Sequence, residues 1–190
     1  MRPALNIVLC GLGGQGILFM TKLLAQAGLD RGFKVMGAET HGMAQRGGPV
    51  VSHLRFGDVV GSLVRTHSAE LLLALDESEA YRNLPFLKEG GTLIVNADPR
   101  RFPGAKVRGY LEKERIVCHA VSAGPIAQAL GAPGALNLAL LGFFSGFNGA
   151  LFNPSEMRDT IAKISPDRAR EKNLLIFDAG LEKALKEKVD

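Results

Sequence analysis

The stretch that decides the fold is LNIVLCGLGGQG, which runs from Leu5 to Gly16. Its first half, Leu5 to Cys10, is an apolar run typical of a parallel strand that is covered on both faces. A glycine-rich turn follows. Over residues 16–30 apolar residues then recur three and four positions apart, which predicts a helix. A strand, a glycine turn and a helix in this order indicate an α/β protein.

The same alternation continues along the chain. We expect further strands at residues 33–38, 49–56, 71–75, 92–96 and 115–120, and further helices at residues 76–84, 125–130, 136–147, 155–164 and 166–188. This order predicts an α/β fold with a Rossmann-like, mostly parallel sheet and flanking helices. The chain shows no internal repeat or linker, so we expect a single domain over residues 1–190. Its core would span residues 5–150, followed by a C-terminal helical extension at residues 151–190.

Residues 49–64 predict an inserted hairpin at one edge of the sheet. Residues 49–56 alternate between apolar and polar, Gly57-Asp58 is a turn signal, and residues 59–64 could return as the partner strand. On the first of these strands, His53 and Arg55 are expected at the surface. Cys10 and Cys118 lie on apolar strands and are expected in the core.

Composition excludes several classes of protein. The formal net charge of +4, the absence of Trp and the presence of just 2 Tyr argue against a nucleic-acid-binding surface. Two cysteines cannot supply the four thiolates of an iron–sulfur cluster or an all-cysteine zinc site, and no His/Asp/Glu spacing suggests a metal site. A chain with just two cysteines also favours a reducing compartment. Since no signal peptide is visible, we expect a cytoplasmic protein.

Residues 116–155 contain no charged side chain, which raises the question of a membrane span. A span needs about 20 mostly apolar residues in succession. Here Gly, Pro and Asn residues interrupt the stretch repeatedly. We therefore expect no membrane span but buried helices, partly covered by another subunit.

The strongest local motif is GLGGQG at residues 11–16, which fits the pattern G-x-G-x-x-G between a strand and a helix. Glycines at these places allow a tight turn and bring backbone N–H groups close to a phosphate. Glu39 follows the last glycine by about 20 residues, where an acidic residue would hold a ribose hydroxyl. The alternative is that the glycines serve close packing of the strand and the helix. The candidate phosphate-binding residues are Gly11, Gly13, Gly14, Gln15 and Gly16.

A second motif, ETHGMAQRGG at residues 39–48, has no clean periodicity and predicts a loop. Arg46 could grip a carboxylate or a phosphate with two parallel hydrogen bonds. His41 could donate a proton near neutral pH. Gln45 and Gly47 complete the polar, glycine-rich segment. The alternative is an exposed turn whose charges are solvated.

Five segments in order resemble the gamma subunit of 2-oxoacid:ferredoxin oxidoreductases. They are GLGGQG (11–16), HGMAQRGGPVVSHLRFG (41–57), LLLALDESEA (71–80), LKEGGTLIVN (87–96) and GAPGALNLALLG (131–142). The HGMAQRGG form looks most like the gamma-type domain in the beta subunit of indolepyruvate ferredoxin oxidoreductase. The resemblance spans residues 6–142 and is looser over the C-terminal helices.

The resemblance implies a subunit of a larger enzyme. Such complexes decarboxylate a 2-oxoacid on thiamine diphosphate with Mg²⁺, pass electrons through iron–sulfur clusters to ferredoxin, and usually release an acyl-CoA. The cofactors would lie on partner subunits, since this chain lacks a GDG-type diphosphate–Mg²⁺ motif and enough cysteines, and the isolated chain would be inactive.

By this resemblance, His41 and Arg46 would help to close the active-site cleft and orient the substrate. Gly11, Gly13, Gly14, Gln15, Gly16, Gln45 and Gly47 would contact CoA or another phosphate. Two alternatives stay open. The glycine motif with Glu39 could instead mark a stand-alone NAD-binding oxidoreductase, although 190 residues leave little room for a substrate domain. A non-catalytic module that binds an anionic ligand is the other.

Overall fold

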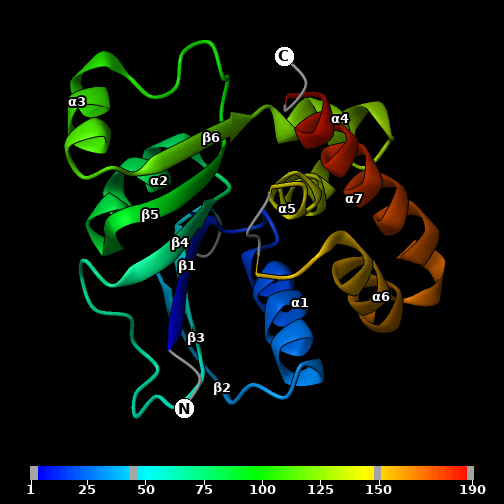
Figure 1. Cartoon of the computed structure of the whole chain (residues 1–190). Coiled ribbons are helices and arrows are strands. Elements are labelled where there is room, and N and C mark those ends of the chain that lie inside the picture. Colours follow the sequence, from blue (N-terminus) through cyan, green and yellow to red (C-terminus); the bar gives the residue numbers. More distant parts are fainter. Residues whose placement is uncertain (1–3, 43–46, 148–150, 188–190) are drawn as a thin grey trace.

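A computed structural model describes residues 4–42, 47–147 and 151–187, so that Gln45 and Arg46 lie outside the described residues. Its centre is a six-stranded sheet in the order β2-β3-β1-β4-β5-β6 (Figure 1). The strands are β1 (Leu5–Leu12), β2 (Val35–His41), β3 (Pro49–Phe56), β4 (Ala69–Ala74), β5 (Leu87–Asn96) and β6 (Val117–Val121). Strands β1, β4, β5 and β6 pair in parallel, whereas β3 runs antiparallel to both β1 and β2. The expected α/β fold with a mostly parallel sheet is confirmed.

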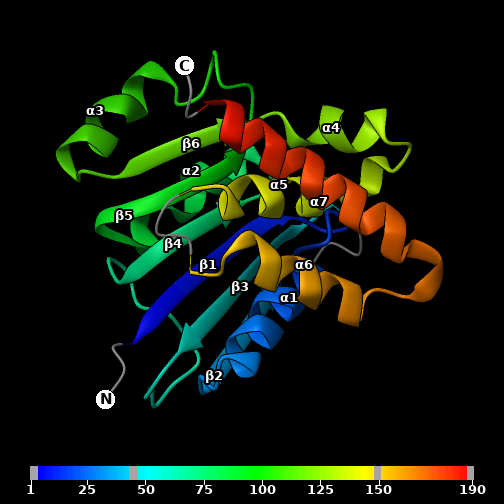
Figure 2. The ribbon, with the colours of Figure 1, turned by 45° about the vertical axis from the view of Figure 1, so that its right-hand side comes forward.

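Helices cover both faces of the sheet. The helical elements are α1 (Ile17–Asp30), α2 (Glu77–Asn83), η1 (Leu84–Phe86), α3 (Ala105–Lys113), α4 (Ala123–Ala129), η2 (Pro133–Ala135), α5 (Leu136–Ser145), α6 (Pro154–Ile164) and α7 (Asp167–Glu187). Figure 2 shows α1, α5, α6 and α7 on one side. Ile7 and Leu9 of β1 point into a core cluster with these helices, while Val8 and Cys10 point into a second cluster under α2 and α3. Because successive side chains of a strand point to opposite faces of the sheet, β1 contributes to both cores.

The part of the uncharged segment that forms α5 lies at the centre of the larger core. In α5, every residue from Asn137 to Ser145 is buried, and α7 lies against this helix. Two glycines allow the close approach: a Cβ at Gly142 would lie 1.9 Å from the carbonyl oxygen of Phe177, and one at Gly180 would lie 2.0 Å from that of Ala139. Among the described helices, none is both long and apolar enough to cross a membrane.

The predicted hairpin of residues 49–64 is wrong: its first strand exists as β3, but residues 59–64 form no strand. Strand β3 pairs with β2 on one side and with β1 on the other, so neither of its edges is left for residues 59–64. Those residues follow an irregular path that two side chains of β3 hold. The Val64 N–H donates to Nδ1 of His53 at 3.2 Å, and Arg55 Nη1 donates to the Gly61 carbonyl at 2.7 Å.

The expectation that residues 39–48 form a loop is wrong at its start. Glu39, Thr40 and His41 belong to β2 and face Ser52, Val51 and Val50 of β3. The ladder with β3 continues into this polar segment because pairing depends on the neighbouring strand as well as on the side chains.

His53 was expected at the surface but is buried, with an exposed fraction of 5%. Its ring meets that of Phe86 edge-on at 5.1 Å between centroids. Burial lowers the pKa of His53, so the neutral ring that accepts the Val64 N–H is favoured.

Candidate functional site

The glycine loop joins β1 to α1 at the carboxyl ends of the parallel strands, which is where open α/β sheets bind ligands. Several of its N–H groups already have partners within the chain. The Leu12 N–H donates to Oε1 of Gln15 at 2.7 Å, and the Gln15 N–H returns a bond to the Leu12 carbonyl at 3.1 Å. The Gly13 N–H donates to the Gly48 carbonyl at 2.9 Å. The loop is thus braced by Gln15 and by the start of β3.

Two of the glycines are required by packing. A Cβ at Gly11 would lie 2.6 Å from Oε1 of Gln15 and 3.0 Å from Cβ of Leu75. Gly16 has a left-handed φ of 86°, and a Cβ there would lie 2.6 Å from Nδ2 of Asn137. These contacts favour the interpretation in which the motif allows the strand and the helices to approach closely.

Asn137 is a site residue that the sequence analysis missed. It is buried in the first turn of α5, and its Nδ2 donates to the Gly16 carbonyl at 3.1 Å. This bond joins the glycine loop to the larger core. The available signal was a single polar residue in the apolar run LNLALLG at residues 136–142.

A pocket of about 390 Å³ brings the glycine loop together with His41. It is lined by Leu12, Gly13, Gly14, Gly16, Ile17, Leu18, Phe19, His41 and Val50. Apart from His41, the lining side chains are apolar, so the pocket suits an apolar group with one hydrogen-bonding group at its edge. The fold thus places two of the sequence motifs side by side.

The connection from β2 to β3 meets this same end of the sheet. The Gly42 N–H donates to the Pro49 carbonyl at 2.8 Å, and Gly47 has a left-handed φ of 72°. The amide of Gly47 lies 3.4 Å from the position of a Cβ on Gly13. The described residues on both sides of 43–46 are therefore fixed next to the glycine loop.

Glu39 does not take the position of the ribose-binding acid in a dinucleotide fold. It faces Ser52 of β3, which in turn faces Leu9 of β1. Strand β3 therefore separates Glu39 from the first strand by two strand spacings, or roughly 10 Å. In the dinucleotide-binding order the acidic strand is the direct neighbour of the first strand. This geometry removes the main support for a stand-alone NAD-binding enzyme.

The two cysteines do not fit a cluster or a nucleophile. Cys10 is fully buried on β1, and its Sγ donates to the Glu79 carbonyl, while Cys118 is half-buried on β6, three strands away. Burial, and then the charge of Glu79, raise the pKa of Cys10; burial raises the pKa of Cys118 to about 11. Both thiols are thus kept protonated. The described residues contain no group of three or more His, Cys, Asp or Glu side chains arranged for a metal ion.

We expect Gly16→Ala to lower the free energy of unfolding by about 2 kcal/mol, because it adds a clash with Asn137 to an unfavourable φ. Gly14→Ala is the matched control. Gly14 also has a positive φ, of 98°, but a Cβ there meets no atom within 4 Å. It should lose about 1 kcal/mol for the backbone alone. Urea unfolding followed by circular dichroism measures both, and equal losses would contradict the role of Asn137.

Comparison with known proteins assigns the family. A sequence profile of pyruvate ferredoxin/flavodoxin oxidoreductases matches residues 6–183. The chain belongs to this family. Two curated members are indolepyruvate oxidoreductase subunits IorB. The one from Pyrococcus horikoshii is 36% identical over 96% of both chains, and the one from Archaeoglobus fulgidus is 32% identical over 95% of this chain and 96% of its own.

Solved structures of related oxidoreductases have the same fold as this chain. The gamma subunit of a keto/oxoacid ferredoxin oxidoreductase from Geobacter sulfurreducens superposes with a TM-score of 0.74 at 23% identity, over 96% of this chain and 99% of its own. A 2-oxoglutarate:ferredoxin oxidoreductase chain from Magnetococcus marinus superposes with a TM-score of 0.72 at 17% identity. It covers 97% of this chain but just 31% of the longer one. These structures show the fold alone; the family profile and the curated relatives of the same extent identify the chain as a small subunit of the 2-oxoacid:ferredoxin oxidoreductase family.

Proposed function

We propose that the chain is the gamma-type subunit of a 2-oxoacid:ferredoxin oxidoreductase complex, in which it closes the active-site cleft of a partner subunit. The observation that carries the proposal is the family match over residues 6–183, together with relatives that are themselves named as oxidoreductase subunits and have the same extent. Thiamine diphosphate, Mg²⁺ and the iron–sulfur clusters would lie on the partners, and the partners would pass electrons to ferredoxin.

The closing surface would be the end of the sheet that carries the glycine loop and the β2–β3 connection. The bond from the Gly13 N–H to the Gly48 carbonyl holds these two segments together, so they can meet a partner as one rigid surface. The apolar pocket with His41 lies between them. An apolar lid over a reacting oxoacid excludes water and strengthens every electrostatic contact beneath it.

Arg46 and Gln45 would supply the polar contacts of this surface. Arg46 would attract the carboxylate of the oxoacid or a phosphate of CoA, since a guanidinium binds either group with two parallel hydrogen bonds. Gly14 and Gly47 leave backbone exposed close by. CoA would therefore meet the edge of the glycine loop rather than a fully formed phosphate cradle.

The substrate class we propose is an aryl 2-oxoacid such as indolepyruvate. The support is the naming of relatives at 31–36% identity as indolepyruvate oxidoreductase subunits, against 25–27% for relatives named after 2-oxoglutarate, ketoisovalerate and pyruvate. The apolar lining of the pocket is compatible with an aromatic group, but the same lining would also receive an apolar side chain of a partner subunit.

An anaerobic pull-down of this chain from its native cytosol tests the proposal. We expect a brown partner that contains iron and thiamine, and a bound fraction that reduces ferredoxin with an oxoacid and CoA. A panel of indolepyruvate, phenylpyruvate, pyruvate and 2-oxoglutarate then tests the substrate class. A single chain that carries neither iron nor thiamine and binds NAD would overturn the subunit assignment, and a preference for pyruvate would overturn the aryl substrate alone.

A further inference from the structure

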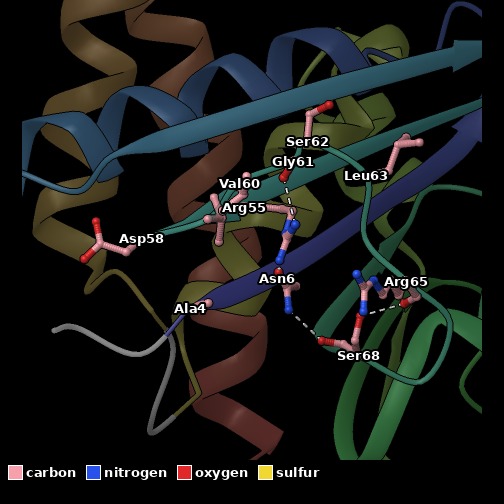
Figure 3. A pocket seen from close by; sticks show the side chains of 11 residues that line it. Ala4, Asn6, Arg55, Asp58, Val60, Gly61, Ser62, Leu63, Arg65 and Ser68 are labelled. Carbon is pink, nitrogen blue, oxygen red and sulfur yellow. Dashed lines mark hydrogen bonds between the residues drawn. The ribbon is translucent and has the colours of Figure 1, made fainter.

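A second, larger pocket of about 890 Å³ lies at the opposite end of the sheet from the glycine loop. Figure 3 shows it between the start of β1, the end of β3 and the irregular segment of residues 57–68. It is lined by Ala4, Asn6, Arg55, Asp58, Val59, Val60, Gly61, Ser62, Leu63, Arg65 and Ser68. Because β1 runs the length of the sheet between the two sites, roughly 25 Å separates them, and the two pockets share no lining residue.

Arg55 is a half-buried cation at the centre of the pocket. Its Nε donates to Oδ1 of Asn6 at 2.8 Å, and its Nη1 donates to the Gly61 carbonyl at 2.7 Å. Both acceptors are neutral. The amide of Asn6 is fixed in turn, since its Nδ2 donates to the Ser68 carbonyl at 2.8 Å. Arg55 is therefore held in one orientation by groups that do not balance its charge.

The pocket carries an excess of positive charge. Within the part of the chain that the structure describes, no ion pair includes Arg55 or Arg65. The carboxylate in the lining, that of Asp58, is bonded to Nζ of Lys34 at 2.9 Å. A partly buried guanidinium without an anion is an unfavourable arrangement that an incoming oxyanion would relieve.

The rim of the pocket is apolar. Val60 is fully exposed and Leu63 is exposed by 61%. Both lie on the segment that His53 and Arg55 hold in place through Val64 and Gly61. A ligand that puts an oxyanion against Arg55 would therefore contact apolar side chains with the rest of its surface. The volume lies in the range of small-molecule sites, about 300–1,000 Å³.

We propose that this pocket binds an oxyanion, a carboxylate or a phosphate, between Arg55 and Arg65. The guanidinium of Arg65 suits either group because its planar N–H fork matches two oxygens. Arg55, whose Nε and Nη1 already donate to Asn6 and Gly61, would add its remaining N–H groups. The oxyanion could come from a free anionic metabolite or from an acidic side chain of a partner subunit. The site is independent of the proposed cleft-closing role, and its failure would leave that role untouched.

The experiment is an amide chemical-shift titration of the full ¹⁵N-labelled chain with sodium pyrophosphate, and separately with succinate, at constant ionic strength. We expect saturable shifts at Arg55, Gly61, Ser62 and Arg65. Arg65→Ala should weaken binding at least tenfold. Arg65 is the informative position because its side chain, unlike that of Arg55, bonds to no described residue. Arg108→Ala, which removes an exposed arginine from α3, is the matched control and should change nothing.

A second arm identifies the source of the oxyanion. If neither anion binds but Arg65→Glu weakens assembly with the partner subunit at least tenfold while Arg108→Glu does not, the oxyanion belongs to the partner. Saturable binding of the free anions by the wild-type chain identifies a metabolite site. The proposal is wrong if the shifts are absent or unaffected by Arg65→Ala and assembly also tolerates Arg65→Glu.

Discussion

Gly142→Ala is expected to lower the free energy of unfolding by about 2 kcal/mol. The added Cβ would lie 1.9 Å from the Phe177 carbonyl oxygen of α7, which is backbone and cannot rotate away. The two helices must therefore separate, and the overpacking costs about 3 kcal/mol. The better helix propensity of alanine returns about 1 kcal/mol of that. Urea unfolding followed by circular dichroism gives the net value.

The matched control is Gly109→Ala on α3. Gly109 is also within a helix, but a Cβ there meets no atom within 4 Å. This variant should gain up to about 1 kcal/mol from helix propensity alone. The same substitution thus has opposite signs on two helices of one protein. If Gly142→Ala left the free energy of unfolding unchanged or raised it, as Gly109→Ala should, α5 and α7 would not pack as closely as described.

The second large effect is expected in catalysis. In the assembled complex, Arg46→Ala should lower kcat/KM for the oxoacid about 100-fold, because truncating one partner of a buried charge pair costs about 2–5 kcal/mol. This loss is expected if Arg46 binds the oxoacid as proposed above. Gly42 and Gly48, the described residues near the segment 43–46, form backbone hydrogen bonds at the glycine-loop end of the sheet.

Two controls make the Arg46 result specific. Arg46→Lys keeps the charge but loses the bidentate fork, so it should fall between the wild type and Arg46→Ala. Arg101→Ala removes an arginine that lies far from Arg46 in sequence and has a side chain that is 87% exposed. This substitution should leave the rate unchanged. Sedimentation shows whether each complex is intact. Intact complexes with unaltered constants for both oxoacid and CoA would contradict the role of Arg46.

The sequence was sufficient for the parts of the fold that depend on local pattern. Apolar runs located β1, β4, β5 and β6, and Asp76 was correctly placed at a helix start, where its side chain accepts the N–H groups of Ser78 and Glu79. Strand β3 was also located, but its partner was not. Alternation along a strand says which side chains share a face; it does not say which strand lies alongside.

The candidate site was predictable in position and less so in detail. The glycine loop lies where the motif places it, and His41 lies beside it in the same pocket. However, the partner of the Gly13 N–H is Gly48, which is brought to it by the antiparallel pairing of β1 with β3. The same pairing places β3 between β1 and β2, and so keeps Glu39 away from the first strand. Such contacts join residues far apart in sequence, and no local pattern encodes them.

The packing of α5 against α7 also sets the order in which the protein can be completed during synthesis. Helix α5 is buried along its length, yet the helix that covers it, α7, lies further along the chain, beyond α6. A ribosome that adds about 5–20 residues per second leaves the apolar surface of α5 uncovered for several seconds. During that interval the nascent chain presents a ready target for chaperones and for aggregation. Loss of α7 would make that exposure permanent.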